Sequence, residues 1–245
     1  HLKVSVGGGM AVQGAVAKLW LEKTGCPICE GYGLSETSPS ATCNPVTSKE
    51  FTGTIGLPIP STYIAILDDD GREVPLGQPG EIAIKGPQVM AGYWQRPDAT
   101  AAVFEGEWFL TGDIGRMDED GDLWIVDRKK DLVIRGGYNV YPREVEEVLY
   151  GHPDIREAAV IGVPDERLGE EIAAVVTPQP GAHIEPAALR SWLEERLAAY
   201  KVPRIYQLVE ELPKGATGKI LKRALDRPTI ATSGERPARA ATPTT

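Results

Sequence analysis

The sequence predicts an α/β plus α+β fold: the end of a large α/β domain that includes a β-rich subdomain, followed by a small C-terminal α+β domain. An apolar strand, a glycine turn and a helix follow one another near the start, which is typical of an α/β domain. Strand-like alternation dominates residues 54–126, and apolar strands alternate with helices in residues 132–225. We therefore expect a first domain at 1–126 and a second at 132–225.

The first domain begins with the strand-like segment Leu2–Val6 and the glycine turn Gly7–Gly9. Apolar residues then recur at helical spacing, and Gly25 supplies a stop; these residues are Val12, Ala15, Val16, Leu19 and Trp20. A short strand at Pro27–Glu30 leads into the turn Gly31–Thr37. Since the chain starts with His1 and enters a strand at once, we expect that its beginning has been cut away.

The β-rich subdomain, residues 54–126, is predicted from alternating segments separated by acidic turns. Thr62–Leu67 and Glu81–Lys85 alternate apolar and polar residues, and Asp122–Val126 follows a turn. Asp68–Gly71 and Asp118–Gly121 are predicted hairpin turns, because glycine readily takes the positive φ that such turns need.

A dense charge cluster at Asp127–Asp131 lies between two apolar strands and marks the domain boundary. Beyond it, Pro142 opens a predicted helix that carries Val145, Val148 and Leu149 on one face. The strands Ala158–Val163 and Ile172–Thr177 follow. Pro186 opens a second helix, for which we expect inward-facing Leu189, Trp192, Leu193, Leu197 and Tyr200.

The last segment, residues 226–245, is rich in Pro, Ala, Thr and Arg and has little that could form a core. Such a composition favours the unfolded chain, because too little apolar surface is available to offset the loss of conformational entropy. We expect a disordered tail.

The composition excludes some classes of protein. The 245 residues are 42% hydrophobic and 25% charged, with a net charge of -9, so we expect a globular protein with no nucleic-acid partner. No apolar run approaches the length of a transmembrane segment. The three cysteines, Cys26, Cys29 and Cys43, are too few and too irregular for a disulfide framework, which favours a cytoplasmic location.

The segment Trp108–Asp113 ends an apolar strand in a small turn that presents one carboxylate. A carboxylate with free lone pairs can accept hydrogen bonds from two neighbouring hydroxyls, such as those of a ribose. By itself, this pattern favours an aspartate that caps its own turn.

The turn Gly31–Glu36 has a similar double interpretation. It could place Tyr32 flat against a nucleotide base, and Ser35 and Glu36 near a phosphate and its Mg²⁺, since magnesium takes oxygen ligands. The alternative is an ordinary exposed turn.

The loop Pro213–Lys219 differs from a P-loop. Pro213 stands where glycine is needed, and Ile220 stands where the P-loop has Ser or Thr. The segment therefore predicts a flexible loop that presents Lys219 as a point charge for a phosphate or carboxylate, or else a surface loop with solvated lysines.

Other candidate sites are weaker. Cys26 and Cys29 form a lone CxxC pair without a second pair or a nearby histidine, so buried thiols are a better interpretation than a metal or redox site. The turn Asp118–Asp122 lacks the spacing of a calcium loop. His152 and His183 have no accompanying Ser or Cys elbow, which argues against a hydrolytic triad.

Taken in order, these segments resemble the adenylate-forming superfamily, and most closely its fatty-acyl-CoA ligase branch. The resemblance covers most of residues 1–225. It rests on GYGLSET (31–37), GEIAIKGPQVMAGYW (80–94), WFLTGDIG (108–115), GDLWIVDRKKDLVIRGGYNVYPREVE (121–146) and PKGATGKILKR (213–223).

The resemblance implies a nucleotide site in the first domain. Tyr32, followed by Gly33, would stack on adenine; Ser35, where the family usually has Thr, would lie at the α-phosphate; and Glu36 would hold Mg²⁺. Asp113 would bind the ribose hydroxyls, and Arg128 would also contact the nucleotide. Gly8 and Gly9 would line the floor of the acyl and nucleotide pocket.

The resemblance also implies a small, mobile C-terminal domain. Lys130 would be its hinge residue, within a hinge at 127–131. Lys219 would bridge the substrate carboxylate and the α-phosphate during adenylation. Gly136 and Gly137 would border the tunnel for the pantetheine arm of coenzyme A.

The implied reaction joins a carboxylic acid, chiefly a fatty acid, to coenzyme A with ATP and Mg²⁺, through an acyl-adenylate. Peripheral membrane contact is compatible with such a substrate. The hydroxyl- and glycine-rich phosphate loop of the family is not in this sequence, so we expect a fragment that is inactive by itself. The alternatives are a ligase for aromatic or short-chain acids, or a non-catalytic remnant that binds only nucleotide or a partner.

Overall fold

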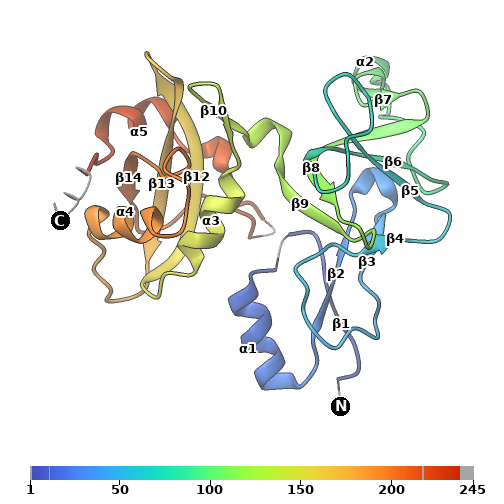
Figure 1. Ribbon diagram of the computed structural model, residues 1–245, viewed down its shortest axis with the longest axis horizontal. Helices are drawn as coiled ribbons and strands as arrows, with labels where there is room; N and C mark the ends of the chain where they lie inside the picture. The colour runs from blue at the N-terminus through green and yellow to red at the C-terminus, as the bar shows by residue number, and fades with distance from the viewer. Residues whose placement is uncertain (1, 11, 217, 238–245) are drawn as a thin grey trace. The chain divides into compact units, whose positions relative to one another are not determined.

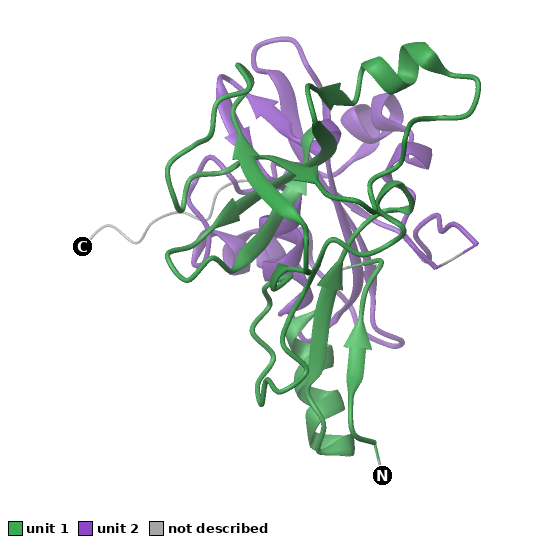
Figure 2. Cartoon of the chain, turned by 90° about the vertical axis from the view of Figure 1, so that its right-hand side faces the viewer, with its two compact units in different colours: residues 1–129 green, residues 130–245 purple. Residues whose placement is uncertain are grey.

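The computed structural model describes residues 2–10, 12–216 and 218–237. The chain divides into two compact units, His1–Lys129 and Lys130–Thr245, which are coloured separately in Figure 2. The division falls within the charge cluster at 127–131. Each unit has its own sheets and its own hydrophobic cores.

The first unit opens with a parallel β–α–β arrangement. Strand β1 (Ser5–Gly7) pairs with β2 (Ile28–Tyr32) in parallel, and helix α1 (Gly14–Thr24) connects them (Figure 1). Gly25 ends the helix with φ +68°, and its N–H donates to the carbonyl of Leu21. Strands β3 (Thr42–Cys43) and β4 (Leu57–Pro58) extend this sheet in antiparallel fashion.

Helix α1 forms where its spacing predicts, but its apolar stripe is open to solvent in the described part of the chain. Val16 and Leu19 are 56% and 55% exposed, and the side chain that α1 buries is the small Ala17. Helical periodicity correctly gives the type of element, but it does not show which face is covered.

The β-rich part of the first unit is an antiparallel sheet in the order β5-β6-β8-β7, with β9 paired to β8. Its core is built from alternate residues of these strands, including Ile82, Ile84, Phe109 and Leu123, each at most 2% exposed. The strands form where they are predicted, but the predicted alternation is wrong for β6, because Glu81, Ile82, Ala83 and Ile84 are all buried. The strands are β5 (Tyr63–Leu67), β6 (Gly80–Lys85), β7 (Phe104–Glu105), β8 (Trp108–Met117) and β9 (Leu123–Arg128), and the short helix α2 (Pro97–Ala101) precedes β7.

Both predicted acidic turns reverse the chain. Gly71 and Gly121 have φ +73° and +83°, and the N–H of each donates to the carbonyl of the aspartate three residues earlier. Asp118 also accepts the backbone N–H of Asp120 and of Asp122 through Oδ1, which stabilises the turn between β8 and β9.

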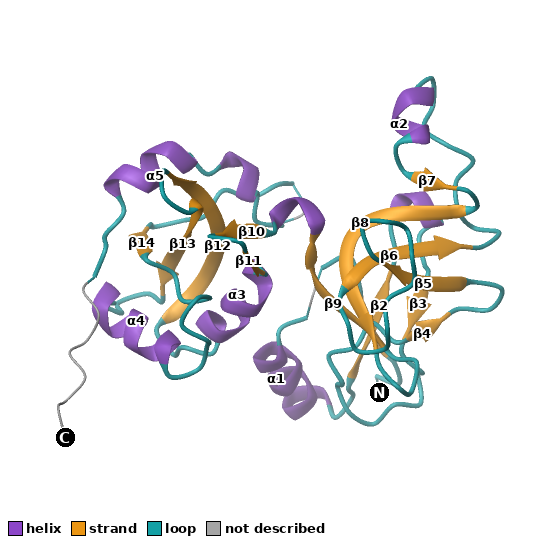
Figure 3. Cartoon of the chain, turned by 45° about the horizontal axis from the view of Figure 1, so that its top comes forward, coloured by secondary structure: helices purple, strands orange, loops and turns teal. Residues whose placement is uncertain are grey.

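The second unit is a sheet of order β11-β10-β13-β12, with β14 parallel to β13 (Figure 3). Helices α3 and α4 begin at Pro142 and Pro186, as the sequence predicts. The elements are β10 (Val133–Arg135), β11 (Tyr138–Val140), α3 (Pro142–Tyr150), β12 (Ile155–Asp165), β13 (Gly169–Pro178), α4 (Pro186–Glu194) and β14 (Ile205–Leu208).

Apolar layers cover both faces of this second sheet. On one face, Val145 and Leu149 of α3 and Leu189 and Leu193 of α4 are fully buried in one cluster with β12 and β13. The intervening residues of the strands face another cluster that includes Ile230. Near-continuous apolar strands are expected when a sheet is covered on both sides.

Tyr200 differs from its predicted inward position, because it is 37% exposed. The prediction extended the second helix through residue 200, whereas α4 ends at Glu194. The helical spacing therefore does not apply to Tyr200.

The predicted disordered tail also requires a correction. Residues 227–233 form helix α5 (Arg227–Ser233), and Ile230 is 4% exposed in the core. The N-cap Asp226 accepts the N–H of Thr229, and Glu235 bridges to Tyr206 of β14. The average composition hides this one apolar anchor and its cap; residues 238–245 lie outside the described part of the chain.

Across the described ranges, no helix has the length and apolar character needed to cross a membrane. Cys26 and Cys29 are buried free thiols and Cys43 is a partly buried one, in agreement with their predicted structural role.

Candidate nucleotide site and lysine hairpin

Asp113 lies at an irregularity in strand β8. Leu110 pairs with Ala83 and Ile114 pairs with Glu81, so Thr111, Gly112 and Asp113 together stand opposite Ile82. Gly112 has φ +73°, a conformation that glycine adopts without steric cost. A β-bulge of this kind bends the strand and redirects a side chain, here the carboxylate of Asp113.

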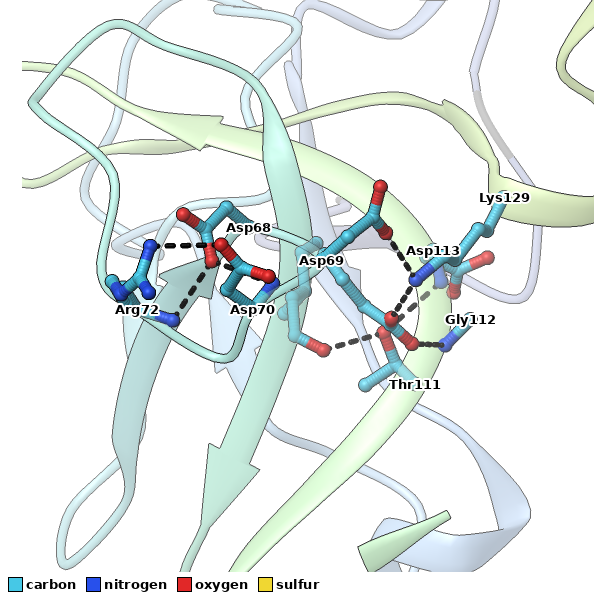
Figure 4. A network of polar contacts seen from close by, with 10 residues as sticks. Asp68, Asp69, Asp70, Arg72, Thr111, Gly112, Asp113 and Lys129 are labelled. Atoms are coloured by element: carbon cyan, nitrogen blue, oxygen red, sulfur yellow. Dashed lines mark hydrogen bonds and ion pairs between the residues drawn. The ribbon is translucent and has the colours of Figure 1, made fainter. Parts of the chain in front are cut away.

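The polar groups that the bulge removes from the ladder are bound by nearby side chains. The N–H of Gly112 donates to Oε1 of Glu81 at 2.9 Å. Thr111 donates through Oγ1 to the carbonyl of Ile82 at 2.8 Å and accepts the N–H of Asp113 at 3.1 Å. Figure 4 shows this turn together with Lys129, whose ammonium contacts Glu81 at 3.0 Å. The backbone that carries Asp113 is thus held on both sides.

Three predicted nucleotide-binding residues converge at this point. Tyr32, at the end of β2, donates from its hydroxyl to Oδ2 of Asp113 at 2.7 Å, across 81 positions of sequence. Arg128, at the end of β9, places Nε 3.5 Å from Oδ1 of the same carboxylate. Asp113 is 9% exposed, whereas the side chain of Arg128 is 54% exposed. The cluster is therefore anchored inside the unit and has one cation reaching into solvent.

Burial raises the pKa of Tyr32 well above its ordinary value, and the negative charge of Asp113 raises it further. The phenol therefore stays protonated and remains a donor to Asp113. An oxygen of a carboxylate can accept more than one hydrogen bond, as binding of a diol at Asp113 would require. The hydrogen bond also fixes the orientation of the Tyr32 ring.

Ser35 and Glu36 lie on the short 3-10 helix η1 (Ser35–Thr37), separated by two residues from Tyr32, where strand β2 ends. Glu36 accepts the hydroxyl of Tyr93 at Oε1 at 2.8 Å, and its carbonyl accepts the N–H of Met90. Ser35 is exposed. Tyr93 orients the Glu36 carboxylate, and the spacing of the sequence gives no sign of this pair.

At the predicted glycines of the first unit, the local backbone either leaves little room for a side chain or has a positive φ. A Cβ on Gly33 would lie 1.7 Å from the carbonyl oxygen of Pro39, so no side chain fits there. A Cβ on Gly8 would lie 3.3 Å from the carbonyl oxygen of Gly31, and Gly9 has φ +79°. These constraints shape the turns beside Tyr32.

For magnesium, the donor set is a single carboxylate. Among the described residues, no group of three or more His, Cys, Asp or Glu side chains could hold a metal ion. Glu36 therefore fits only the type of Mg²⁺ site in which phosphate oxygens and water supply the other ligands.

In the second unit, Gly136 and Gly137 form the turn between β10 and β11. Their φ values are +56° and +86°, as a two-residue type I′ hairpin turn requires. Both glycines are exposed, and the space around a Cβ on Gly137 is open. This hairpin geometry alone explains the glycine pair.

Lys219 stands on a small hairpin of the second unit. Lys214 bridges to Ile220 in antiparallel fashion, and the N–H of Gly215 donates to the carbonyl of Lys219 at 2.9 Å. Lys219 itself is exposed, so its ammonium is accessible. Thr217, which belongs to the predicted loop, lies outside the described residues.

Ion pairs hold both ends of this hairpin. Lys214 contacts Glu157 at 2.7 Å, and Lys222 contacts Glu146 at 2.8 Å. Glu146 also accepts the N–H of Val160 at 2.7 Å. The predicted flexible loop is therefore an exposed tip on a fixed stem.

Lys130, the predicted hinge residue, is the first residue of the second unit and is exposed in the 3-10 helix η2 (Lys129–Asp131). The sequence did not single out Glu81, Thr111 or Lys129, which surround the Asp113 turn. One signal was available: Glu81 is a carboxylate at the start of an otherwise apolar buried strand, and a buried carboxylate needs partners.

The chain is similar to proteins of a known family. The family profile for AMP-binding enzymes matches residues 1–94, and the profile for the C-terminal domain of AMP-binding enzymes matches residues 144–219. A long-chain-fatty-acid–CoA ligase of Yersinia pestis is 53% identical over 224 residues, which are 91% of this chain and 40% of the relative. The chain thus spans about 40% of the length of the curated relatives it matches.

Solved structures give the same result. ATP-bound MatB from Rhodopseudomonas palustris is similar with a TM-score of 0.88 and 37% identity, over 93% of this chain and 45% of that protein. The o-succinylbenzoate CoA synthetase of Bacillus subtilis, in complex with an acyl-adenylate intermediate, has a TM-score of 0.82 and 36% identity, over 90% and 45%. With both family profiles matched in order along its length, the chain belongs to the family of AMP-binding enzymes.

Proposed function

We propose that the protein carrying this sequence is an ATP-dependent acid–thiol ligase. It converts a carboxylic acid and ATP to an acyl-adenylate and then transfers the acyl group to coenzyme A with release of AMP. The observation that carries the proposal is the hydrogen bond between Tyr32 and Asp113, which joins two distant motifs in one polar cluster. The similarity to long-chain-fatty-acid–CoA ligases supports it.

The nucleotide would be held through its ribose and base. Asp113 would accept the ribose hydroxyls, since a carboxylate oxygen can accept more than one hydrogen bond and Tyr32 and Arg128 hold this carboxylate in place. The Tyr32 ring, oriented by its hydroxyl, would stack on adenine. Arg128 would place a charge near the nucleotide from the exposed side of the cluster.

In the first step, a carboxylate oxygen of the acid attacks the α-phosphorus of ATP, and the bond to pyrophosphate breaks. Negative groups must approach one another, so the ammonium of Lys219 would reduce their repulsion and orient the attack. Ser35 would donate to an α-phosphate oxygen. When bound at Glu36, Mg²⁺ would neutralise phosphate charge.

In the second step, the sulfur of coenzyme A attacks the acyl carbon, the thiol proton is lost, and AMP leaves with the bonding electron pair. The exposed hairpin at Gly136 and Gly137 would border the pantetheine arm. Gly8 and Gly9 would lie at the floor of the acyl and nucleotide pocket. Rotation about Lys130 would exchange the two faces of the second unit between the steps.

A long-chain fatty acid is the acid we propose, because a long-chain-fatty-acid–CoA ligase is 53% identical to this chain and other curated relatives carry the same name. An aromatic acid is the second candidate, on the likeness to the o-succinylbenzoate CoA synthetase structure. A cytoplasmic location is proposed from the free thiols and from the co-substrates, with peripheral membrane contact during uptake of a fatty acid.

Pyrophosphate exchange tests the proposed function. The full-length protein is incubated with ATP, labelled pyrophosphate and one acid at a time, from short and long fatty acids to benzoates. Exchange with long-chain acids is expected; exchange only with benzoates would establish the aromatic candidate, and no exchange with any acid would contradict the ligase proposal. Lys219→Ala is expected to reduce the exchange, and Lys49→Ala, at an exposed lysine with no assigned role, is its control.

A further inference from the structure

We propose that Glu81 is a positioning residue for the nucleotide site: its carboxylate holds the Asp113 bulge and the last residue of the first unit together. This inference rests on the proposed function of Asp113 in binding the ribose. Glu81 acts through Gly112 and Lys129 rather than by touching the nucleotide. Nothing in the sequence motifs assigns it a role.

Glu81 is a buried carboxylate. The residue is 9% exposed and lies in strand β6 between apolar neighbours. A carboxylate in such a place is stable only when hydrogen bonds or cations compensate for lost hydration. Glu81 has both, on different oxygens.

Oε1 of Glu81 accepts the N–H of Gly112, the glycine with positive φ in the bulge. This N–H points away from the normal strand ladder and needs an acceptor. Without Glu81, the N–H of Gly112 would lack this acceptor, and the Thr111–Asp113 backbone would lose one of the contacts that hold it. The orientation of the Asp113 carboxylate therefore depends on Glu81.

Oε2 of Glu81 binds the ammonium of Lys129 at 3.0 Å, and Asp69 binds the same ammonium at 2.9 Å. The hydrogen bond to Asp69, and then that to Glu81, raises the pKa of Lys129. Lys129 is the last residue of the first unit and follows Arg128, whose backbone pairs with Asp113. Glu81 thus ties the end of the unit to the strand that carries Asp113.

The two contacts can be separated by substitution. Glu81→Gln keeps an oxygen acceptor for the N–H of Gly112 and removes the charge that attracts Lys129. Glu81→Ala removes both, and Lys129→Met removes only the ion pair. Asp70→Asn is the matched control, because Asp70 lies beside Asp69 and pairs with Arg72 instead.

The test measures AMP affinity by calorimetry, the KM for ATP and kcat in the full-length protein, and amide exchange at Gly112. Glu81→Ala is expected to weaken AMP binding and raise the KM for ATP roughly tenfold, as loss of a charge-assisted hydrogen bond would, with a smaller change in kcat. Exchange at Gly112 should become faster. Glu81→Gln should restore AMP affinity to within about threefold of the original, and Asp70→Asn should leave it unchanged.

Two results would overturn the proposal. One is an unchanged AMP affinity in Glu81→Ala despite faster exchange at Gly112. The other is an equal loss of thermal stability in the Ala and Gln variants with no rescue of affinity, which would make Glu81 a residue of the core alone. Asp113→Ala separates this outcome from a failure of the proposed function: if Asp113→Ala binds AMP normally, the ribose assignment fails, whatever Glu81 does.

Discussion

Two regions hold their polar groups in different ways: the cluster of Tyr32, Asp113 and Arg128 in the first unit, named the nucleotide cluster for its proposed role, and the hairpin of the second unit that carries Lys219, the lysine hairpin. Asp113 is 9% exposed, sits on a bulge, and is bound by Tyr32 and Arg128. Lys219 is exposed at the tip of a hairpin whose stem is held by the ion pairs of Lys214 and Lys222. The first arrangement holds a carboxylate in one orientation, whereas the second presents an exposed ammonium group to solvent.

This difference has a physical reason. A carboxylate that accepts hydrogen bonds from a diol gains most when it is already oriented, because no ordering is then required on binding. A lysine that offsets charge needs reach rather than a fixed direction, since an ammonium is a point charge with three rotatable donors. Substitutions in the two regions should therefore change different measured quantities, and by different amounts.

Lys219→Ala is expected to have the largest effect. Adenylation, measured by pyrophosphate exchange in the full-length protein, should fall about 10²–10³-fold, the usual loss when one charge-stabilising contact is removed. Transfer to coenzyme A from a supplied acyl-adenylate should stay near its original rate. Equal losses in both half-reactions would contradict the role of the hairpin tip.

Ile230→Ala should change the stability of the second unit without changing nucleotide binding by the first. Loss of this buried side chain should lower the free energy of unfolding of the second unit by about 2 kcal/mol, the low end for such a substitution, because the α5 cluster is small. Affinity for AMP should not change, since the nucleotide cluster belongs to the first unit. Chemical denaturation and calorimetry measure the two quantities, and an unchanged stability would show that α5 is not packed as described.

Tyr32→Phe tests the anchoring of the cluster itself. The ring is kept, but the hydrogen bond to Asp113 is lost, so AMP affinity should fall roughly five- to tenfold, in line with the net contribution of about 1 kcal/mol from one hydrogen bond. Tyr63→Phe, at an exposed tyrosine of the same unit, is the control. A Tyr32→Phe variant that binds AMP like the original would show that the hydroxyl does not orient the site.

Glu146→Gln should have the smallest effect, and it should be confined to the second region. It weakens the ion pair with Lys222 at the stem, so adenylation should fall roughly threefold, in line with a partly exposed ion pair, while transfer to coenzyme A is unchanged. Glu211→Gln is the matched control, because Glu211 is exposed and its contact with Lys214 is long, at 4.0 Å. A loss in both half-reactions would mean that Glu146 supports the whole unit rather than the hairpin.

The sequence predicts the fold well where periodicity and turn chemistry act locally. The proline-opened helices at Pro142 and Pro186, the acidic turns and the strands of the β-rich part all form as expected. It fails for Tyr200 and for the tail. There, the outcome depends on where α4 ends and on a single buried side chain, Ile230, rather than on average composition.

For the candidate site, the sequence indicates which residues carry chemistry but not how they are held. Tyr32, Asp113 and Arg128 lie in separate motifs, and their contact depends on the pairing of strands far apart in the chain. Glu81 and Tyr93 act through hydrogen bonds to the groups that the motifs name, and no spacing rule predicts such partners. These supporting contacts are visible only in three dimensions.

The most direct measurement of the central claim, that Asp113 receives the ribose of a bound nucleotide, compares AMP with 2′,3′-dideoxy-AMP in the original protein and in Asp113→Ala. In the original protein, removal of the hydroxyls should weaken binding by about 1.5–3 kcal/mol; in Asp113→Ala, both ligands should bind equally weakly. An equal loss of affinity on removal of the hydroxyls in both proteins would show that the ribose is recognised elsewhere.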